Sequence, residues 1–165
     1  MRANVSAEAQ IAEMAERREA FIRSVESLRE GLFLASLGNW SPRDMVAHLI
    51  GWNRATIVGC RQIQRAELPD YDLDPGENFS KVNAEFVRQY ASRDRRALLE
   101  ELRASARELE AFLRSVSAED WPRDFGVRHD SEVVTISATV RGLSEDYPHH
   151  QRQLEAWVAR GTPAR

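Results

Sequence analysis

The stretch "WSPRDMVAHLIGWNRAT", residues 40–56, contains a helix start followed by an apolar helix face. Ser41 is a residue type that caps helices, Pro42 suits the first helical position, and Asp44 favours the positive end of the helix dipole. Four residues then recur at i, i+3, i+4 and i+7 on one face: Met45, His48, Leu49 and Trp52. We therefore predict a helix from Pro42 towards Arg65 whose buried face includes a histidine.

Three other segments show the spacing of amphipathic helices, and two of them can be assigned directly. One runs from Ser6 to before Gly38 and carries Leu32 near its end. The other begins around Ser80 as a short helix that, after a break at residues 92–94, leads into a long helix.

The third segment begins with "VVTISATV", residues 133–140, and fits two structures. Apolar and hydroxyl residues alternate in it, as they do in a strand. Ile136 nevertheless starts a stripe at helical spacing that extends to Trp157, and the chain has no second good strand for pairing. We predict that this segment begins the last helix.

Segments 67–79 and 117–132 are rich in proline, glycine and aspartate and are predicted to be loops. Four long amphipathic helices joined by one long crossover predict an all-α fold, a four-helix bundle. A short extra helix is expected between the second and third bundle helices. We predict that residues 1–165 form a single domain.

The composition narrows the classes of function. The 165 residues are 42% hydrophobic and 30% charged, with a net charge of -3, so we expect no nucleic-acid partner and no membrane contact. The chain contains no long uncharged apolar run, from which we expect neither a membrane span nor a secretory signal. A single cysteine, Cys60, excludes an internal disulfide, and a cytoplasmic location is the simplest expectation.

A candidate metal site is formed by His48 and by two residues of "DYPHH", residues 146–150. Asp146 and His150 are four residues apart, which places both side chains on one face of an unbroken helix. His48 from a facing helix would complete three ligands and leave a position for water or substrate. The alternative for His48 is a hydrogen-bonded histidine in the core.

Pro148 lies between the two candidate ligands and bears on this prediction. It has no N–H to donate, and its ring crowds the carbonyl group of Ser144. The chain would break here if Pro148 started a new helical segment. Asp146 and His150 would then not converge.

Two of these motifs resemble a known family. "WSPRDMVAHLIGWNRAT" is similar to the second-helix signature of the DinB-like superfamily of four-helix bundles, and "DYPHHQRQLEAW", residues 146–157, is similar to its last helix. The middle of the chain, residues 71–105, looks nearest to the DfsB and ClbS branch and to relatives of mycothiol-dependent maleylpyruvate isomerase.

The resemblance implies an up-down-down-up bundle that is often dimeric, so that a homodimer is expected, with a divalent metal in many members. Residue by residue, His48 takes the first metal-ligand position, His150 the last, and Gln153 the position of a recurring glutamine. The middle ligand, normally a histidine, falls on Asp146, which is a departure from the family pattern.

Two functions from different classes follow. The first is a metal-dependent enzyme, a thiol-dependent transferase or hydrolase, that acts on a small-molecule substrate and holds Zn, Ni or Fe at His48, Asp146 and His150. The second is a metal-independent protein of the ClbS and DfsB type that hydrolyses or sequesters a reactive small molecule. A non-catalytic helical dimer is a third alternative. The sequence does not decide whether the chain is an enzyme, and it identifies no catalytic residue.

Aromatic residues near the histidines are candidates for a binding pocket. Trp52, Tyr147 and Trp157 are the predicted pocket residues, and core packing is the alternative for each. His149 is expected to be exposed, because it lies about 100° around the helix from His150. Cys60 has no identifiable acid–base partner in the sequence, so we expect a buried thiol.

Overall fold

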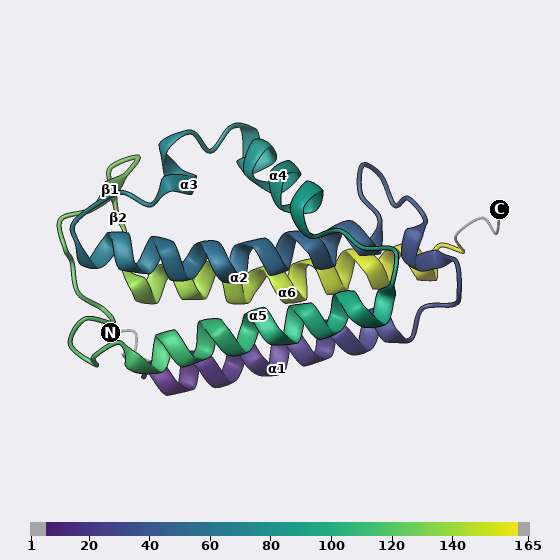
Figure 1. The fold of residues 1–165 in the computed structure, drawn as a ribbon, viewed down its shortest axis with the longest axis horizontal. Helices are drawn as coiled ribbons and strands as arrows, with labels where there is room; N and C mark the ends of the chain where they lie inside the picture. The colour runs from purple at the N-terminus through teal and green to yellow at the C-terminus, as the bar shows by residue number, and fades with distance from the viewer. Residues whose placement is uncertain (1–5, 162–165) are drawn as a thin grey trace.

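The structure, a computed structural model, describes residues 6–161 as a bundle of four long helices (Figure 1). The helices are α1 (Ala7–Glu26), α2 (Pro42–Gln64), α5 (Arg95–Ser115) and α6 (Ile136–Ala159). The all-α four-helix fold is thereby confirmed. The two ends of the predicted 1–165 domain, residues 1–5 and 162–165, lie outside the described residues.

The four helices pack as two pairs. The closest pairs are α1 with α6 and α2 with α5. In Figure 1, α1 and α6 run from left to right, whereas α2 and α5 run from right to left. Fully buried side chains from all four helices form the core between the pairs: Phe21, Ile22, Leu49, Leu102, Leu109 and Ile136.

The start of α2 is formed as the sequence predicts. Ser41 caps the helix, since its hydroxyl accepts a hydrogen bond from the Asp44 backbone N–H. The Asp44 carboxylate in turn accepts one from the Ser41 backbone N–H at 2.9 Å, which completes a capping box. Both residues are buried, so the packing around them fixes the first turn of α2.

The first helix is shorter than predicted. It ends at Glu26, and Leu32 lies instead in a short 3₁₀ helix, η1 (Leu32–Leu34). Gly31 adopts a left-handed conformation with a φ of 88°, which turns the chain before η1. The Arg95 guanidinium donates to the Leu28 carbonyl at 2.9 Å, so a side chain of α5 satisfies a backbone group that a continued helix would have bonded.

The crossover contains more structure than predicted. The short helix α4 (Ser80–Tyr90) is confirmed, and it packs on the outer side of α2 (Figure 1). The predicted loop 67–79 also contains α3 (Asp70–Leu73) and η2 (Glu77–Phe79). These turns escaped the sequence analysis because each is too short to show a helical period.

The second predicted loop, 117–132, includes most of a small hairpin. Strands β1 (Arg128–His129) and β2 (Glu132–Val133) pair antiparallel, and Trp121 ahead of them is buried with its indole N–H donating to Gln10 at 2.7 Å. The hairpin leads directly into α6. Thr135 caps this helix by accepting from the Ala138 N–H, so the helical interpretation of the last segment is correct from Ile136 onward.

Pro148 does not break α6, which continues through it to Ala159. A proline inside a helix removes one backbone hydrogen bond and costs about 3 kcal/mol. Apolar side chains before and after it are buried, including Leu143 and Leu154, and burial of each contributes roughly 1.5–3 kcal/mol. Packing on both sides therefore keeps the helix continuous.

No helix within residues 6–161 is long and apolar enough to cross a membrane.

Gly51 provides a test of how closely α4 approaches α2. A Cβ built on Gly51 would lie 2.1 Å from the ring of Phe86 in α4, so Gly51→Ala requires that ring or α4 to move. We expect a loss of about 1–3 kcal/mol in the free energy of unfolding, typical of an overpacked contact. Urea denaturation measures it.

Gly142→Ala is the matched control. Gly142 lies inside α6, and a Cβ there would meet no atom within 4 Å. Replacing a helical glycine with alanine should stabilise the protein by up to about 1 kcal/mol. Equal effects of the two substitutions would contradict the described contact between Gly51 and Phe86.

Candidate metal centre

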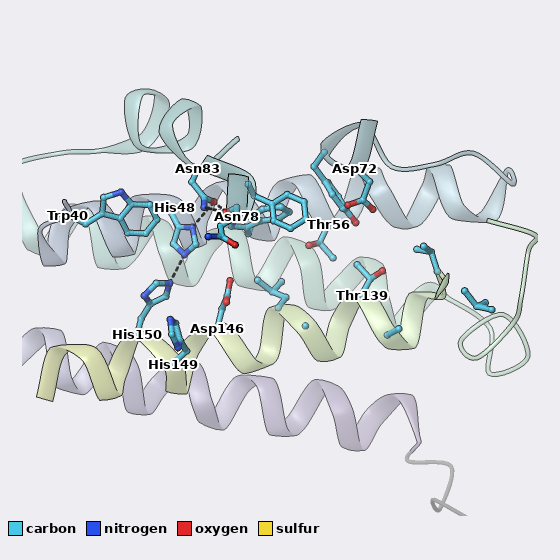
Figure 2. Close-up of a pocket in the computed structure, with 18 residues that line it drawn as sticks. Trp40, His48, Thr56, Asp72, Asn78, Asn83, Thr139, Asp146, His149 and His150 are labelled. Carbon is cyan, nitrogen blue, oxygen red and sulfur yellow. Dashed lines mark hydrogen bonds between the residues drawn. The ribbon is translucent and has the colours of Figure 1, made fainter. Parts of the chain in front are cut away.

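A cavity of about 590 Å³ lies between α2, the crossover and α6 (Figure 2). Residues from α2, α3, η2, α4 and α6 line it, together with Val133 of β2 and Val134 after it. His48, Asp146 and His150 are among the residues that line this cavity. Figure 2 shows His48 on α2 pointing towards His150 on α6, with Asp146 beside them.

The three predicted ligands converge. One ligand atom from each of His48, Asp146 and His150 lies within 4.8 Å of the others. The two histidines are buried and Asp146 is half-buried. The continuity of α6 through Pro148 is what brings Asp146 and His150 onto one face.

The hydrogen bonds of His48 determine which ring nitrogen carries its proton. The Asn83 side-chain oxygen accepts from the Trp52 indole N–H at 2.8 Å, which identifies that atom as the amide oxygen. It lies 3.1 Å from His48 Nδ1, so Nδ1 of His48 must be the donor. His48 Nε2 then carries a lone pair directed into the cluster.

His150 is oriented in the same way from its own helix. Its Nδ1 donates to the Gln153 side-chain oxygen at 2.8 Å, one helical turn further along α6. His150 Nε2 is therefore also without a proton, and it lies 2.9 Å from His48 Nε2. Two lone pairs at this distance do not form a hydrogen bond with each other, since neither nitrogen offers a proton.

A cation bound to both Nε2 atoms would remove the repulsion between their lone pairs. Two imidazole nitrogens bound to one Zn²⁺ at about 2.0–2.1 Å lie about 2.9–3.4 Å apart, depending on the angle at the ion. The observed 2.9 Å falls at the lower end of that range. Hydrogen-bonded Nδ1 atoms are the usual second contact of metal-binding histidines. The donor set and its orientation therefore fit a divalent metal.

Burial changes the pKa values of all three groups. It lowers the pKa of His48 to about 3, with the neighbouring charge of His150 adding to the shift, and it lowers the pKa of His150 to about 4. Burial raises the pKa of Asp146 to about 6, against the opposing effect of His149. Both imidazoles are thus neutral at pH 7, the form in which histidine binds metals.

The Trp40 ring packs against both histidines. The Trp40 ring centroid lies 4.7 Å from that of His48 and 5.9 Å from that of His150, so the indole covers the cluster on one side. His149 is exposed, as expected, although it also borders the cavity.

The three predicted pocket residues do not line the same cavity. Trp52 lines the cavity. Tyr147 does not: it is 1% exposed in the bundle core, where its hydroxyl donates to Asn53, because it lies about 100° around α6 from Asp146. Trp157 lines a different cavity of about 930 Å³, which lies beyond His150 and includes Arg152 and Arg160.

Asn83 is the main residue that the sequence analysis missed. It orients both His48 and Trp52 from α4. It occupies an apolar stripe with Phe79, Phe86 and Tyr90, at spacings of four, three and four residues. A polar residue in that stripe is the same kind of signal as His48 in the stripe of α2, and it could have identified Asn83.

Comparison with known proteins identifies a family and several structures of the same fold. The sequence profile of the mycothiol maleylpyruvate isomerase N-terminal domain matches residues 34–155. No curated protein sequence matches this chain.

Three solved structures illustrate the fold. Colibactin self-resistance protein ClbS, solved in complex with double-stranded DNA, has a TM-score of 0.75 at 16% identity, covering 98% of this chain and 99% of ClbS. DfsB, described as a sibling lethal factor precursor, has a TM-score of 0.77 at 13% identity, covering 96% and 98%. Mycothiol-dependent maleylpyruvate isomerase has a TM-score of 0.70 at 16% identity, covering 90% of this chain and 60% of that protein. The predicted resemblance is confirmed: the profile shows the family, and ClbS and DfsB share the fold of this chain.

Cys60 offers a test of burial in α2. Its side chain is fully buried, and burial raises the pKa of the thiol to about 12 from an ordinary 9.0. Because the thiolate is the reactive form, we expect the folded protein to react with Ellman's reagent at pH 8 at least about 100-fold more slowly than the unfolded protein. The chain has one cysteine, so one equivalent should react in denaturant. Rapid reaction of the native protein would place Cys60 at an accessible position instead.

Proposed function

The chain belongs to the mycothiol maleylpyruvate isomerase N-terminal domain family, and from this premise we propose that it is a divalent-metal-dependent enzyme that acts on a small molecule. The metal ligands are His48, Asp146 and His150, and the substrate occupies the adjoining cavity. The observation that carries the proposal is the 2.9 Å distance between His48 Nε2 and His150 Nε2, with each Nδ1 against an amide oxygen and a carboxylate beside them.

Each residue of the cluster has a defined task in this proposal. His48 and His150 supply neutral nitrogen ligands, and Asp146 supplies a charged oxygen ligand. Asn83 and Gln153 hold the two imidazoles in the required tautomers. Trp40 covers the histidines from one side and limits the access of water there.

A bound divalent ion would supply Lewis acidity and would lower the pKa of a water molecule or a substrate thiol. Zn, Ni and Fe all accept two imidazoles and one carboxylate, and the carboxylate in place of a third histidine favours a harder ion. The family name points to a thiol cosubstrate, and we propose transfer to or from a thiol, or hydrolysis, as the reaction class. The cavity volume of about 590 Å³ suits a substrate of drug-like size.

A metal-independent protein that hydrolyses or sequesters a reactive small molecule is the second candidate. The observation in its favour is the similarity to ClbS, a self-resistance protein, over nearly the whole of both chains. The ClbS structure contains double-stranded DNA, whereas the net charge of -3 on this chain favours a partner other than nucleic acid. A homodimer stays a prediction, and light scattering at micromolar concentration measures it.

Metal content separates the two candidates. We expect about one equivalent of Zn, Ni or Fe in the purified protein by elemental mass spectrometry. His48→Ala and His150→Ala should each lose more than about 90% of this metal, because the two ligands that remain in each variant do not hold the ion. His129→Ala is the matched control: it removes the histidine of β1, which lies outside the cluster. A folded wild-type protein that takes up no divalent metal on dialysis would overturn the proposed enzyme.

Asn83 tests the orientation of His48. Asn83→Ala removes the acceptor of the His48 N–H, and we expect metal affinity to fall by roughly 10–100-fold. Asn83→Asp keeps an acceptor oxygen in the same place and should retain the affinity. Competition with a fluorescent chelator gives both values, and equal affinities for the alanine and aspartate variants would show that Asn83 does not orient the ligand.

A further inference from the structure

The cavity has a second polar end, away from the histidine pair. Thr56 follows His48 by eight residues on α2, and Thr139 precedes Asp146 by seven on α6, which corresponds to roughly 10–12 Å along the helices at 1.5 Å per residue. Figure 2 shows Thr56, Thr139 and Asp72 on the side of the cavity away from Trp40. Tyr71 and Asp72 of α3 both line the cavity.

Asp72 is a half-buried carboxylate that accepts no hydrogen bond from the described residues. Its side chain is 10% exposed. The nearest cationic candidate is His129 Nδ1 of the hairpin, at 3.8 Å from Oδ1, which is beyond hydrogen-bond distance. Burial raises the pKa of Asp72 above its ordinary value, with His129 opposing the shift. Carboxylates in such positions are normally paired.

Tyr71, next to Asp72, has an unsatisfied hydroxyl. In the part of the chain that the structure describes, its oxygen is the one buried side-chain polar atom without a partner in hydrogen-bond geometry, and the Thr139 hydroxyl is its polar neighbour. The ring is held in place: it lies 5.1 Å from the Trp52 ring, and it covers Gly59, where an added Cβ would come within 2.7 Å of it. The hydroxyl is therefore positioned rather than free to seek another partner.

The charged residues that line the cavity determine which ligands can bind at the Asp72 end. Of the 18 lining residues, all within residues 6–161, the carboxylate-bearing ones are Asp72 and Asp146, and none is a lysine or an arginine. Between the two ends, the walls include Trp52, Phe79 and Leu143. An anionic group at the far end would face the Asp72 carboxylate, whereas a protonated amine would supply the hydrogen-bond donors that His129, at 3.8 Å, does not provide.

We propose that Asp72 binds the protonated amino group of the substrate, so that the substrate is a small amine with an apolar middle portion. The ammonium group donates to the Asp72 carboxylate. The opposite end of the molecule, roughly 10 Å away, faces His48 and Asp146. The assignment of that opposite end as the reacting end rests on the proposed function, whereas the amine subsite does not require a metal.

Two probes of opposite charge test the subsite: tryptamine and indole-3-propionate, which share a ring and a two-carbon chain. Calorimetric titration of the full-length, EDTA-treated protein at pH 7.5 should show tryptamine binding at least ten-fold more tightly than indole-3-propionate. Asp72→Asn should weaken tryptamine binding by ten-fold or more. Asp74→Asn is the matched control, because Asp74 ends the same helix with the same charge but lies exposed, paired with Lys81.

The proposal is overturned if indole-3-propionate binds as tightly as tryptamine, if neither probe binds, or if Asp72→Asn and Asp74→Asn have equal effects. Metal content is measured in parallel. Tryptamine binding that persists in His48→Ala, in a protein found to take up no metal, would support the amine subsite while the proposed metal enzyme fails. Stoichiometric metal with no amine binding would support the proposed metal enzyme and overturn the amine subsite.

Discussion

The contact between His48 and His150 is the interaction on which the centre of this molecule depends. Each ring comes from a different helix of the bundle, and each Nδ1–H is bonded to an amide oxygen, so that the two Nε2 lone pairs meet at 2.9 Å. The rings are nearly perpendicular, at 86°. Because α4 supplies Asn83 and the chain before α2 supplies Trp40, the arrangement requires the crossover and the loop as well as the two helices.

Two locally unfavourable residues, Gly51 and Pro148, lie within this arrangement. Gly51 lowers the helix propensity of α2 but allows the Phe86 ring to lie where a side chain would be, which brings α4, and with it Asn83, close to His48. Pro148 removes a backbone hydrogen bond from α6 between two of the converging side chains. In both places, tertiary packing outweighs an intrinsic cost, as is common near functional sites.

The cavity beside the histidines combines two kinds of chemistry. One end holds three groups suited to a divalent ion, and the other holds a carboxylate without a hydrogen-bond donor. Apolar and aromatic walls join them. Proteins as different as ClbS, DfsB and maleylpyruvate isomerase share this fold, so the bundle itself does not select the chemistry. Side chains such as Asp72, which come from the crossover, would select the ligand.

Local patterns were sufficient to predict the helices and the three converging residues. The cap at Ser41, the stripe through His48 and the four-residue spacing of Asp146 and His150 are properties of neighbouring residues, which the sequence by itself determines. The end of α1, the hairpin, the burial of Tyr147, and the roles of Asn83 and Asp72 were decided by the tertiary structure alone. The physical reason is that each depends on a partner from another element. Arg95 donates to the Leu28 carbonyl just after α1, and Asn53 accepts from the Tyr147 hydroxyl. The residues that partly bury Asp72 come from several parts of the chain.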